Sequence, residues 1–196
     1  MLAAFNTFQT IMQRARAMHG LHGSLSKQLT SAVDLSDMLR SELVLAVSAF
    51  DFFIHEVTRL GMLECYSGRR VRTAAFEKFQ VPMALLSSRS ETALDIEIRT
   101  RHGYKSFQSP VKVAEAIRLI SEIDLWQAVA AEIGVDHKEI KRQLNLIVDR
   151  RNKIAHEADV DPSYPNQLWP IDPKMVEDVF DLIERIAEKI LLIVSR

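Results

Sequence analysis

The sequence predicts an all-α fold. Apolar residues recur at steps of three and four along most of the 196 residues, whereas the alternation that is typical of strands is weak. Glycine and proline, which interrupt helices, number only six each. Because 47% of the residues are hydrophobic and no repeat is visible, we expect one domain, residues 1–196, with its own core.

Two helices are expected in the N-terminal part. The first should run over about residues 2–19, with the segment 20–23 loosening or ending it through its two glycines. The second should span about residues 36–66, since its apolar residues draw one face at helical spacing and Ser67-Gly68 provides a stop. Charged residues interrupt its most apolar stretch, which therefore indicates a buried helix and not a membrane span.

The middle of the chain, residues 69–110, is the least regular part. It contains Pro82, the pair Ser87-Ser88 and His102-Gly103, and we expect short helices and loops there, as an irregular insert within the domain. A single helix should then begin near Pro110 and end at Gly134.

The C-terminal part is expected to hold two more helices. Asp136 can cap the first of them. Prolines at 162, 165, 170 and 173 then require a loop that cannot be helical, and the last helix should run from about Pro173 to the end.

Composition bounds the function. The 25 Lys and Arg residues are balanced by 26 Asp and Glu residues, so a nucleic-acid site would have to be a local patch. The single cysteine, Cys65, excludes an internal disulfide and is expected to be a buried small hydrophobe. The first residues lack a basic segment followed by an apolar one, so we expect no signal peptide, no membrane association and a cytoplasmic location.

One string carries the chemistry: Arg151-Asn152-Lys153-Ile154-Ala155-His156-Glu157. It gathers a guanidinium, an amide and an imidazole near the predicted end of a helix. Arginine offers a charged fork for phosphate oxygens, and histidine can transfer a proton near neutral pH. The string therefore suits a phosphodiester.

The helical positions of these residues leave alternatives open. Arg151 falls on the apolar stripe, where it is an ordinary buried ion pair, an arginine whose charged end extends to the edge of the core, or an arginine directed into a cleft. Asn152 and His156 lie on a polar stripe, which by pattern alone is a solvated face. Because positions five apart differ by roughly 140° on a helix, Arg151 and His156 meet only if the helix ends between them, if the arginine wraps round, or if a second subunit completes the site.

The second predicted helix offers a supporting residue, Asp51. It lies between Phe50 and Phe52 and should be at least partly buried, and a buried carboxylate requires a cation. Arg151 and His156 are candidates for that cation, and Arg59 and Arg40 are alternatives. His55, on the same side, is expected to be structural.

The segment DRRNKIAHEADVDP, residues 149–162, resembles the HEPN superfamily, whose signature is an arginine, four to six residues, and a histidine. A polar residue, often asparagine, follows that arginine, and Asn152 occupies this position. The segment LRSELVLAVSAFDFFIHEV, residues 39–57, looks like the long helix of the RiboL-PSP-HEPN branch. The resemblance covers about residues 36–66 and 136–196, and the middle, 69–134, shows no match.

The resemblance implies a bundle of four to six helices that forms a homodimer, with the two motifs facing each other across a cleft. It also implies a metal-independent endoribonuclease, without a cofactor, in a toxin–antitoxin, phage-defence or RNA-processing role. Arg151, Asn152 and His156 would be catalytic, and Arg150 and Lys153 would contact RNA. A neutralising antitoxin or defence partner is then expected, although Ala158 stands where toxins paired with a nucleotidyltransferase carry a tyrosine.

Two other functions compete with the nuclease. The first is a non-catalytic dimeric helical module that binds RNA or acts as an adaptor. The second is a metallo-hydrolase that would use His156, Asp159, Asp51 and His55, but the sequence has no His-Asp dipeptide, no His-Glu-x-x-His helix and no cysteine pair.

Overall fold

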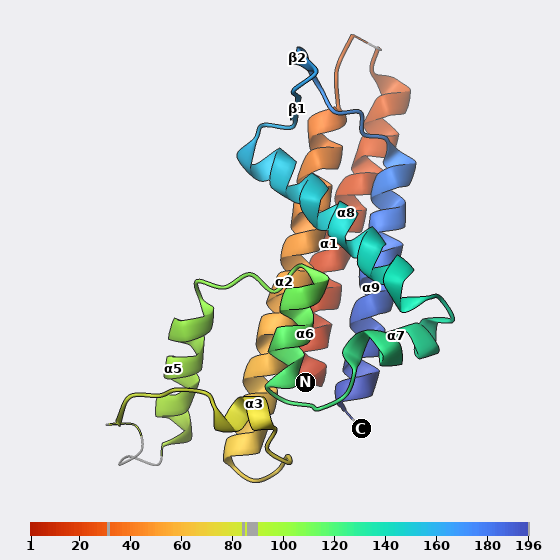
Figure 1. The fold of residues 1–196 in the computed structure, drawn as a ribbon. Coiled ribbons are helices and arrows are strands. Elements are labelled where there is room, and N and C mark those ends of the chain that lie inside the picture. Colours follow the sequence, from red (N-terminus) through yellow and green to blue (C-terminus); the bar gives the residue numbers. More distant parts are fainter. Residues whose placement is uncertain (31, 84, 86–89, 196) are drawn as a thin grey trace.

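The protein is a bundle of long helices crossed by shorter ones (Figure 1). The structure, a computed structural model, describes residues 1–30, 32–83, 85 and 90–195. These residues form eight helices and one two-stranded hairpin. The elements are α1 (Leu2–Gln28), α2 (Ser36–Tyr66), α3 (Ala74–Glu77), α5 (Glu91–His102), α6 (Pro110–Arg118), α7 (Leu125–Ile133), α8 (His137–His156), β1 (Val160–Asp161), β2 (Tyr164–Leu168) and α9 (Pro173–Val194).

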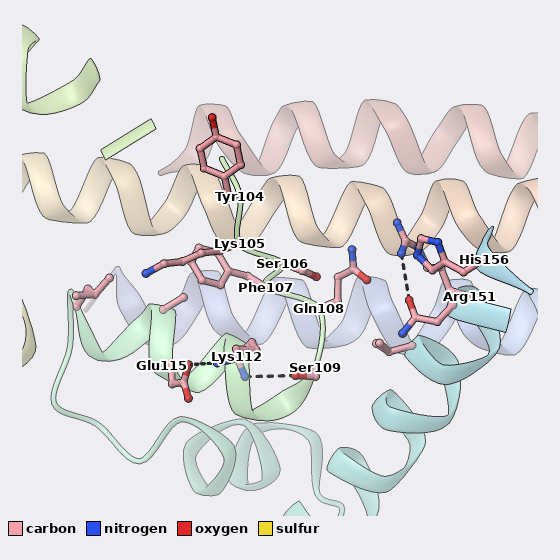
Figure 2. Close-up of a pocket in the computed structure, with 14 residues that line it drawn as sticks. Tyr104, Lys105, Ser106, Phe107, Gln108, Ser109, Lys112, Glu115, Arg151 and His156 are labelled. Carbon is pink, nitrogen blue, oxygen red and sulfur yellow. Dashed lines mark hydrogen bonds and ion pairs between the residues drawn. The ribbon is translucent and has the colours of Figure 1, made fainter. Parts of the chain in front are cut away.

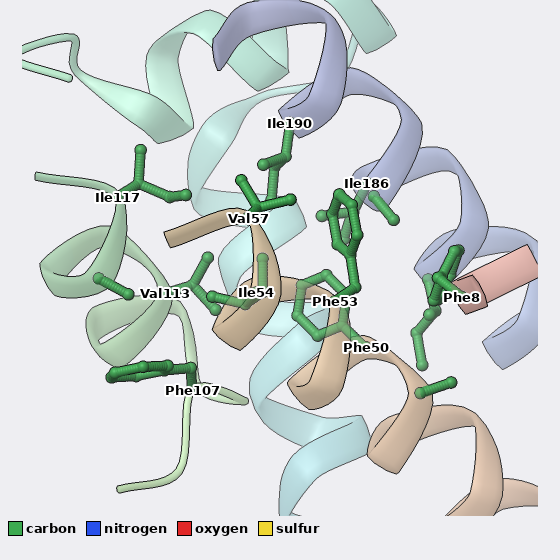
Figure 3. Close-up of a cluster of buried hydrophobic side chains, with 14 of the residues drawn as sticks. Phe8, Phe50, Phe53, Ile54, Val57, Phe107, Val113, Ile117, Ile186 and Ile190 are labelled. Carbon is green, nitrogen blue, oxygen red and sulfur yellow. The ribbon is translucent and has the colours of Figure 1, made fainter. Parts of the chain in front are cut away.

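The helix α2 is the centre of the bundle. It packs against α1, α5, α6, α8 and α9, and Figure 3 shows its apolar side chains meeting those of its neighbours. Phe53 and Val57 are fully buried between Phe8 of α1 and Ile186 and Ile190 of α9. The spacing of three and four in residues 36–66 thus produces the predicted helix and the core face that holds the other helices.

Gly61 of α2 allows the segment after α6 to pack closely against α2. A Cβ on Gly61 would lie 2.6 Å from Cγ2 of Ile120, which is too close for any real contact. Ile120, just after α6, therefore packs directly on the backbone of α2, and α6 is held close to it.

The helix α8 lies across the long helices and contacts α2, α6 and α7. Asp136 caps it as predicted, accepting a hydrogen bond of 2.6 Å from the backbone N–H of Lys138. Its buried stripe is Ile140, Leu144 and Ile147. The structure confirms the predicted start of this helix and its apolar face.

Three predictions about the elements were wrong. The helix α1 continues through Gly20 and Gly23 to Gln28, because His22 is buried on it and this packing outweighs the cost of about 1 kcal/mol for each helical glycine. The helix expected from Pro110 to Gly134 is divided into α6 and α7, since Asp124 caps a new helix by accepting from the N–H of Gln127. This division, together with the short helices α3 and α5, gives eight helices among the described residues, more than the expected four to six.

The proline-rich loop also contains more order than expected. The strands β1 and β2 pair in antiparallel fashion between α8 and α9. In the middle, the short helices α3 and α5 agree with the prediction, whereas the pair Ser87-Ser88 lies outside the described residues.

Two further points concern the expected environment. Cys65 is fully buried, as predicted, and burial raises the pKa of its thiol. In the described ranges, every helix is either too short or too polar to cross a membrane.

Candidate active site

The motif opens onto a cavity of about 710 Å³. One side of the cavity is formed by α8, through Val148, Arg151, Asn152 and His156. The other side is formed by residues 104–109, which we call the pocket wall, together with four residues of the adjoining 110–119 stretch. Figure 2 shows the motif at one end of the cavity and Tyr104 towards the other. The volume lies in the range of about 300–1,000 Å³ that is usual for ligand sites.

The side chains of Arg151 and His156 meet at the same cavity although α8 is unbroken between them. The helix α8 is continuous from His137 to His156, so it does not end between the two motif residues. The Nη1 of Arg151 donates a 3.1 Å hydrogen bond to Oδ1 of Asn152, and all three motif side chains line the same cavity. The arginine therefore wraps round, which was one of the three alternatives; completion by a second subunit stays a prediction.

The guanidinium of Arg151 is not neutralised. No carboxylate of the described residues lies within ion-pair distance of it, and its buried Nε has no hydrogen-bond partner among them. The interpretation of Arg151 as an ordinary ion pair is thus wrong for this part of the chain. His156, the exposed last residue of α8, remains accessible from solvent.

Arg150, next to Arg151, belongs to a different arrangement, which we call the latch (Arg40, Arg150 and Asp159). The carboxylate of Asp159 is 1% exposed and accepts from Nε of Arg40 at 2.7 Å and from Nη2 of Arg150 at 2.8 Å. Both arginines also donate to the backbone oxygen of Trp169, each at 3.0 Å. Burial lowers the pKa of Arg150, an effect that Asp159 opposes.

The latch closes the turn that follows His156. Ala158 and Asp159 have φ values of 51° and 57°, in the left-handed region that costs a non-glycine residue about 1–2 kcal/mol. Asp159 holds this turn by donating its N–H to the oxygen of Lys153 at 3.0 Å and by accepting from the N–H of Trp169 at 2.9 Å. These contacts favour a structural role for Arg150 over the RNA contact predicted from the sequence.

Lys153 lies beside the latch. Its Nζ is 3.1 Å from Oδ2 of Asp149 and 5.0 Å from the centre of the Trp169 ring, and its side chain is one-third exposed. It is not among the residues that line the cavity.

Asp51 is half-buried, as expected, but none of the four cations expected to pair with it does so; instead, Nε2 of His55, one turn further along α2, lies 3.8 Å from its Oδ1. Its Oδ1 accepts from the N–H of Phe107 at 2.6 Å, and its Oδ2 accepts from Nε2 of Gln108 at 3.2 Å. The prediction of Arg151 or His156 as its partner was wrong, because both oxygens of Asp51 accept from the pocket wall and Arg151 donates to Asn152 instead. Asp51 instead fastens that wall to α2.

The two alternative partners of Asp51 are occupied elsewhere. Arg40 pairs with Asp159 in the latch, and Arg59 pairs with Glu56 and Asp95 at 2.8 and 2.9 Å. The hypothesis of a metal site also loses its ligands, since Asp159 and Asp51 are held in separate networks. Within the described ranges, no three His, Cys, Asp or Glu side chains are grouped so that they could hold a metal ion.

The sequence did not indicate the pocket wall. Residues 104–109 have no periodicity and no recognisable motif, and hydrogen bonds to Asp51 and His55 of α2 hold them at the cavity. The one local signal was Ser109-Pro110, a cap followed by a first-turn proline, which marks the start of α6 but not its cavity.

Comparison with protein families places the chain in a known family. The model of the RiboL-PSP-HEPN family matches residues 21–195. The match includes residues 69–134, for which the motif and the long helix gave no counterpart. Searches of curated proteins and of solved structures returned no match.

Proposed function

The chain belongs to the RiboL-PSP-HEPN family, and on this premise we propose that it is a metal-independent endoribonuclease with Arg151, Asn152 and His156 as catalytic residues. Family membership supports an RNA-related role. The observation that carries the proposal is that the three motif side chains line one cavity and that Arg151 has no carboxylate partner among the described residues. An unneutralised guanidinium at a cavity is suited to an anionic phosphate.

The reaction uses a nucleophile that RNA itself supplies. The 2′-oxygen attacks the adjacent phosphorus, its proton passes to a base, and the bond from phosphorus to the 5′-oxygen breaks as that oxygen gains a proton. The products are a 2′,3′-cyclic phosphate and a 5′-hydroxyl.

Each motif residue has a role in this reaction. His156 takes the proton from the 2′-hydroxyl or gives one to the leaving 5′-oxygen. Arg151 binds the non-bridging phosphate oxygens, on which negative charge develops. Asn152 orients Arg151 through the 3.1 Å hydrogen bond between their side chains.

A homodimer would supply both proton-transfer groups. Because the described residues of one chain offer a single histidine to the cavity, a second copy whose motif faces the first would provide the acid while the first provides the base. The same proposal includes a role in toxin–antitoxin, phage-defence or RNA-processing systems, with a neutralising or triggering partner.

The test is cleavage of RNA by the purified protein in EDTA. The wild type is compared with His156→Ala and with His137→Ala, a matched control at the opposite end of α8. We expect cleavage by the wild type and by the control, no cleavage by His156→Ala, and cyclic phosphate ends. DNA should survive because it lacks the 2′-hydroxyl.

Other outcomes would replace the proposal. Equal cleavage by His156→Ala, or cleavage of DNA, would remove the mechanism. Tight RNA binding without cleavage by any of the three proteins would favour the non-catalytic RNA-binding module.

A further inference from the structure

The pocket wall is a fixed surface, although it has no regular secondary structure. Asp51 accepts the N–H of Phe107 at 2.6 Å, and Nε2 of His55 lies 3.2 Å from the backbone oxygen of Lys105. Phe107 and Gln108 are buried, at 3% and 5% exposure. Two residues of α2 thus hold the backbone of the wall in place opposite the motif.

Tyr104 is the exception within this wall. Its side chain is 94% exposed, although the neighbouring backbone is tied by the N–H of Lys105 to the oxygen of His102 at 2.8 Å. It lines the same cavity as Arg151 and His156, from the other end (Figure 2). An aromatic ring that is solvent-exposed on an anchored backbone has both faces available to a flat ligand.

The charges between the two ends suit a polyanion. The cavity is lined by the cations Lys105, Lys112 and Arg151 and by one carboxylate, Glu115, which is 2.8 Å from Nζ of Lys112. The side chain of Lys105 has no ion pair with a described residue. A chain of phosphates that begins at Arg151 would therefore meet a second free cation near Tyr104.

We infer that the cavity binds single-stranded RNA across its whole length, with Arg151 holding a phosphate at one end, Tyr104 stacking on a nucleobase at the other end and Lys105 contacting a phosphate near that base. This inference rests on the proposed function and specifies its substrate class. Bases stack on exposed aromatic rings largely regardless of sequence, provided that they are unpaired. A duplex keeps its bases stacked on one another and cannot offer one to Tyr104.

The test measures binding in a background that cannot cleave. The His156→Ala protein is titrated with a fluorescent single-stranded RNA of mixed sequence and with the same sequence as a duplex. Adding Tyr104→Ala should weaken binding of the single strand by about tenfold, the size of one lost stacking contact, and should leave duplex binding unchanged. Adding Tyr104→Phe should restore the affinity, because it keeps the ring and removes only the hydroxyl.

Tyr164 provides the matched control. It is a tyrosine that is 61% exposed on β2 and does not line the cavity. Tyr164→Ala should bind the single strand like the background protein. Because Tyr104 is almost fully exposed, its loss should not change the thermal unfolding midpoint, and that measurement verifies that the variants are folded.

The inference is overturned if Tyr104→Ala binds the single strand as tightly as Tyr104→Phe, or if Tyr164→Ala weakens binding equally. These binding results do not depend on cleavage. If the wild-type protein does not cleave RNA but Tyr104→Ala weakens RNA binding, the proposed function is rejected and the binding site is kept. If the wild type cleaves RNA but Tyr104→Ala leaves binding unchanged, the binding site is rejected and the function is kept.

Discussion

Arg150 and Arg151 are neighbours in the sequence, yet they serve opposite sides of the last turns of α8. Arg150 turns into the latch, where a buried carboxylate and two backbone oxygens accept from its Nη2. Arg151 turns to the cavity, where its side chain donates to the amide oxygen of Asn152. The two residues differ in how their charge is neutralised. The charge of Arg150 is paired with the buried carboxylate of Asp159, whereas the charge of Arg151 remains available to a ligand.

This comparison indicates how neighbouring residues of a short motif can divide two tasks, stabilising the local structure and binding a ligand. His156 ends α8, and the left-handed turn at Ala158 and Asp159 begins two residues later. The latch fixes this turn to α2 through Arg40. We interpret the latch as the support that keeps His156 at the cavity on which Arg151 opens.

The largest expected effect is on the latch side. Asp159→Ala removes a buried carboxylate, leaves Arg150 without a carboxylate partner among the described residues, and leaves Arg40 with only the exposed Asp37, 3.4 Å away. We expect the free energy of unfolding to fall by about 3–5 kcal/mol, measured by urea denaturation. Asp149→Ala, which removes a carboxylate that is 63% exposed and pairs with Lys153, is the matched control and should cost at most about 1 kcal/mol.

A small loss of unfolding free energy in Asp159→Ala would contradict the structural role given to Arg150 and the latch. It would mean that the two arginines find water or other partners, and that the latch does not hold the turn after His156. Equal losses in both aspartate variants would mean that burial of Asp159 in the latch gives it no special weight over the exposed Asp149.

The second prediction separates the two arginines directly. Arg151→Lys should lower kcat for RNA cleavage by about 10²-fold, because an ammonium lacks the planar fork that binds phosphate, and should leave the unfolding free energy unchanged. Arg150→Lys should keep kcat within about twofold and lower the unfolding free energy by about 1–2 kcal/mol, since the Nη2 that meets three oxygens is lost. Paired kinetics and urea unfolding of the two variants measure both quantities.

Equal losses of kcat in the two lysine variants would contradict the division of roles. In that case the latch and the cavity would act as one unit, and Arg150 would have to be treated as part of the catalytic arrangement.

The motif helix and the pocket wall differ in how far the sequence could predict them. The start of α8 followed from the cap at Asp136, and the motif followed from a local string, because both depend on residues close in the chain. The cation for Asp51 was assigned wrongly, since its true partners, Phe107 and Gln108, come from a segment more than fifty residues away. The pocket wall was missed for the same reason: it has no pattern of its own, and only tertiary contacts place it opposite the motif.

The boundary errors have a similar origin. Glycines 20 and 23 suggested an end to α1, but the packing of His22 against the bundle decides the matter and no local rule reports it. The division between α6 and α7 could have been found, because Asp124 is a good cap residue that precedes an apolar run.

The smallest expected effect concerns Lys153, which the sequence assigned to RNA and which lies beside the latch in the structure. Its Nζ contacts Asp149 and the ring of Trp169, so Lys153→Ala should cost at most about 1 kcal/mol of unfolding free energy. Because it does not line the cavity, the dependence of single-stranded RNA affinity on salt should stay as in the parent protein. A decrease of about 0.7 in the steepness of log affinity against log salt would instead mean that Lys153 contacts a phosphate. The RNA-binding surface would then extend beyond the cavity to the part of α8 that lies beside the latch.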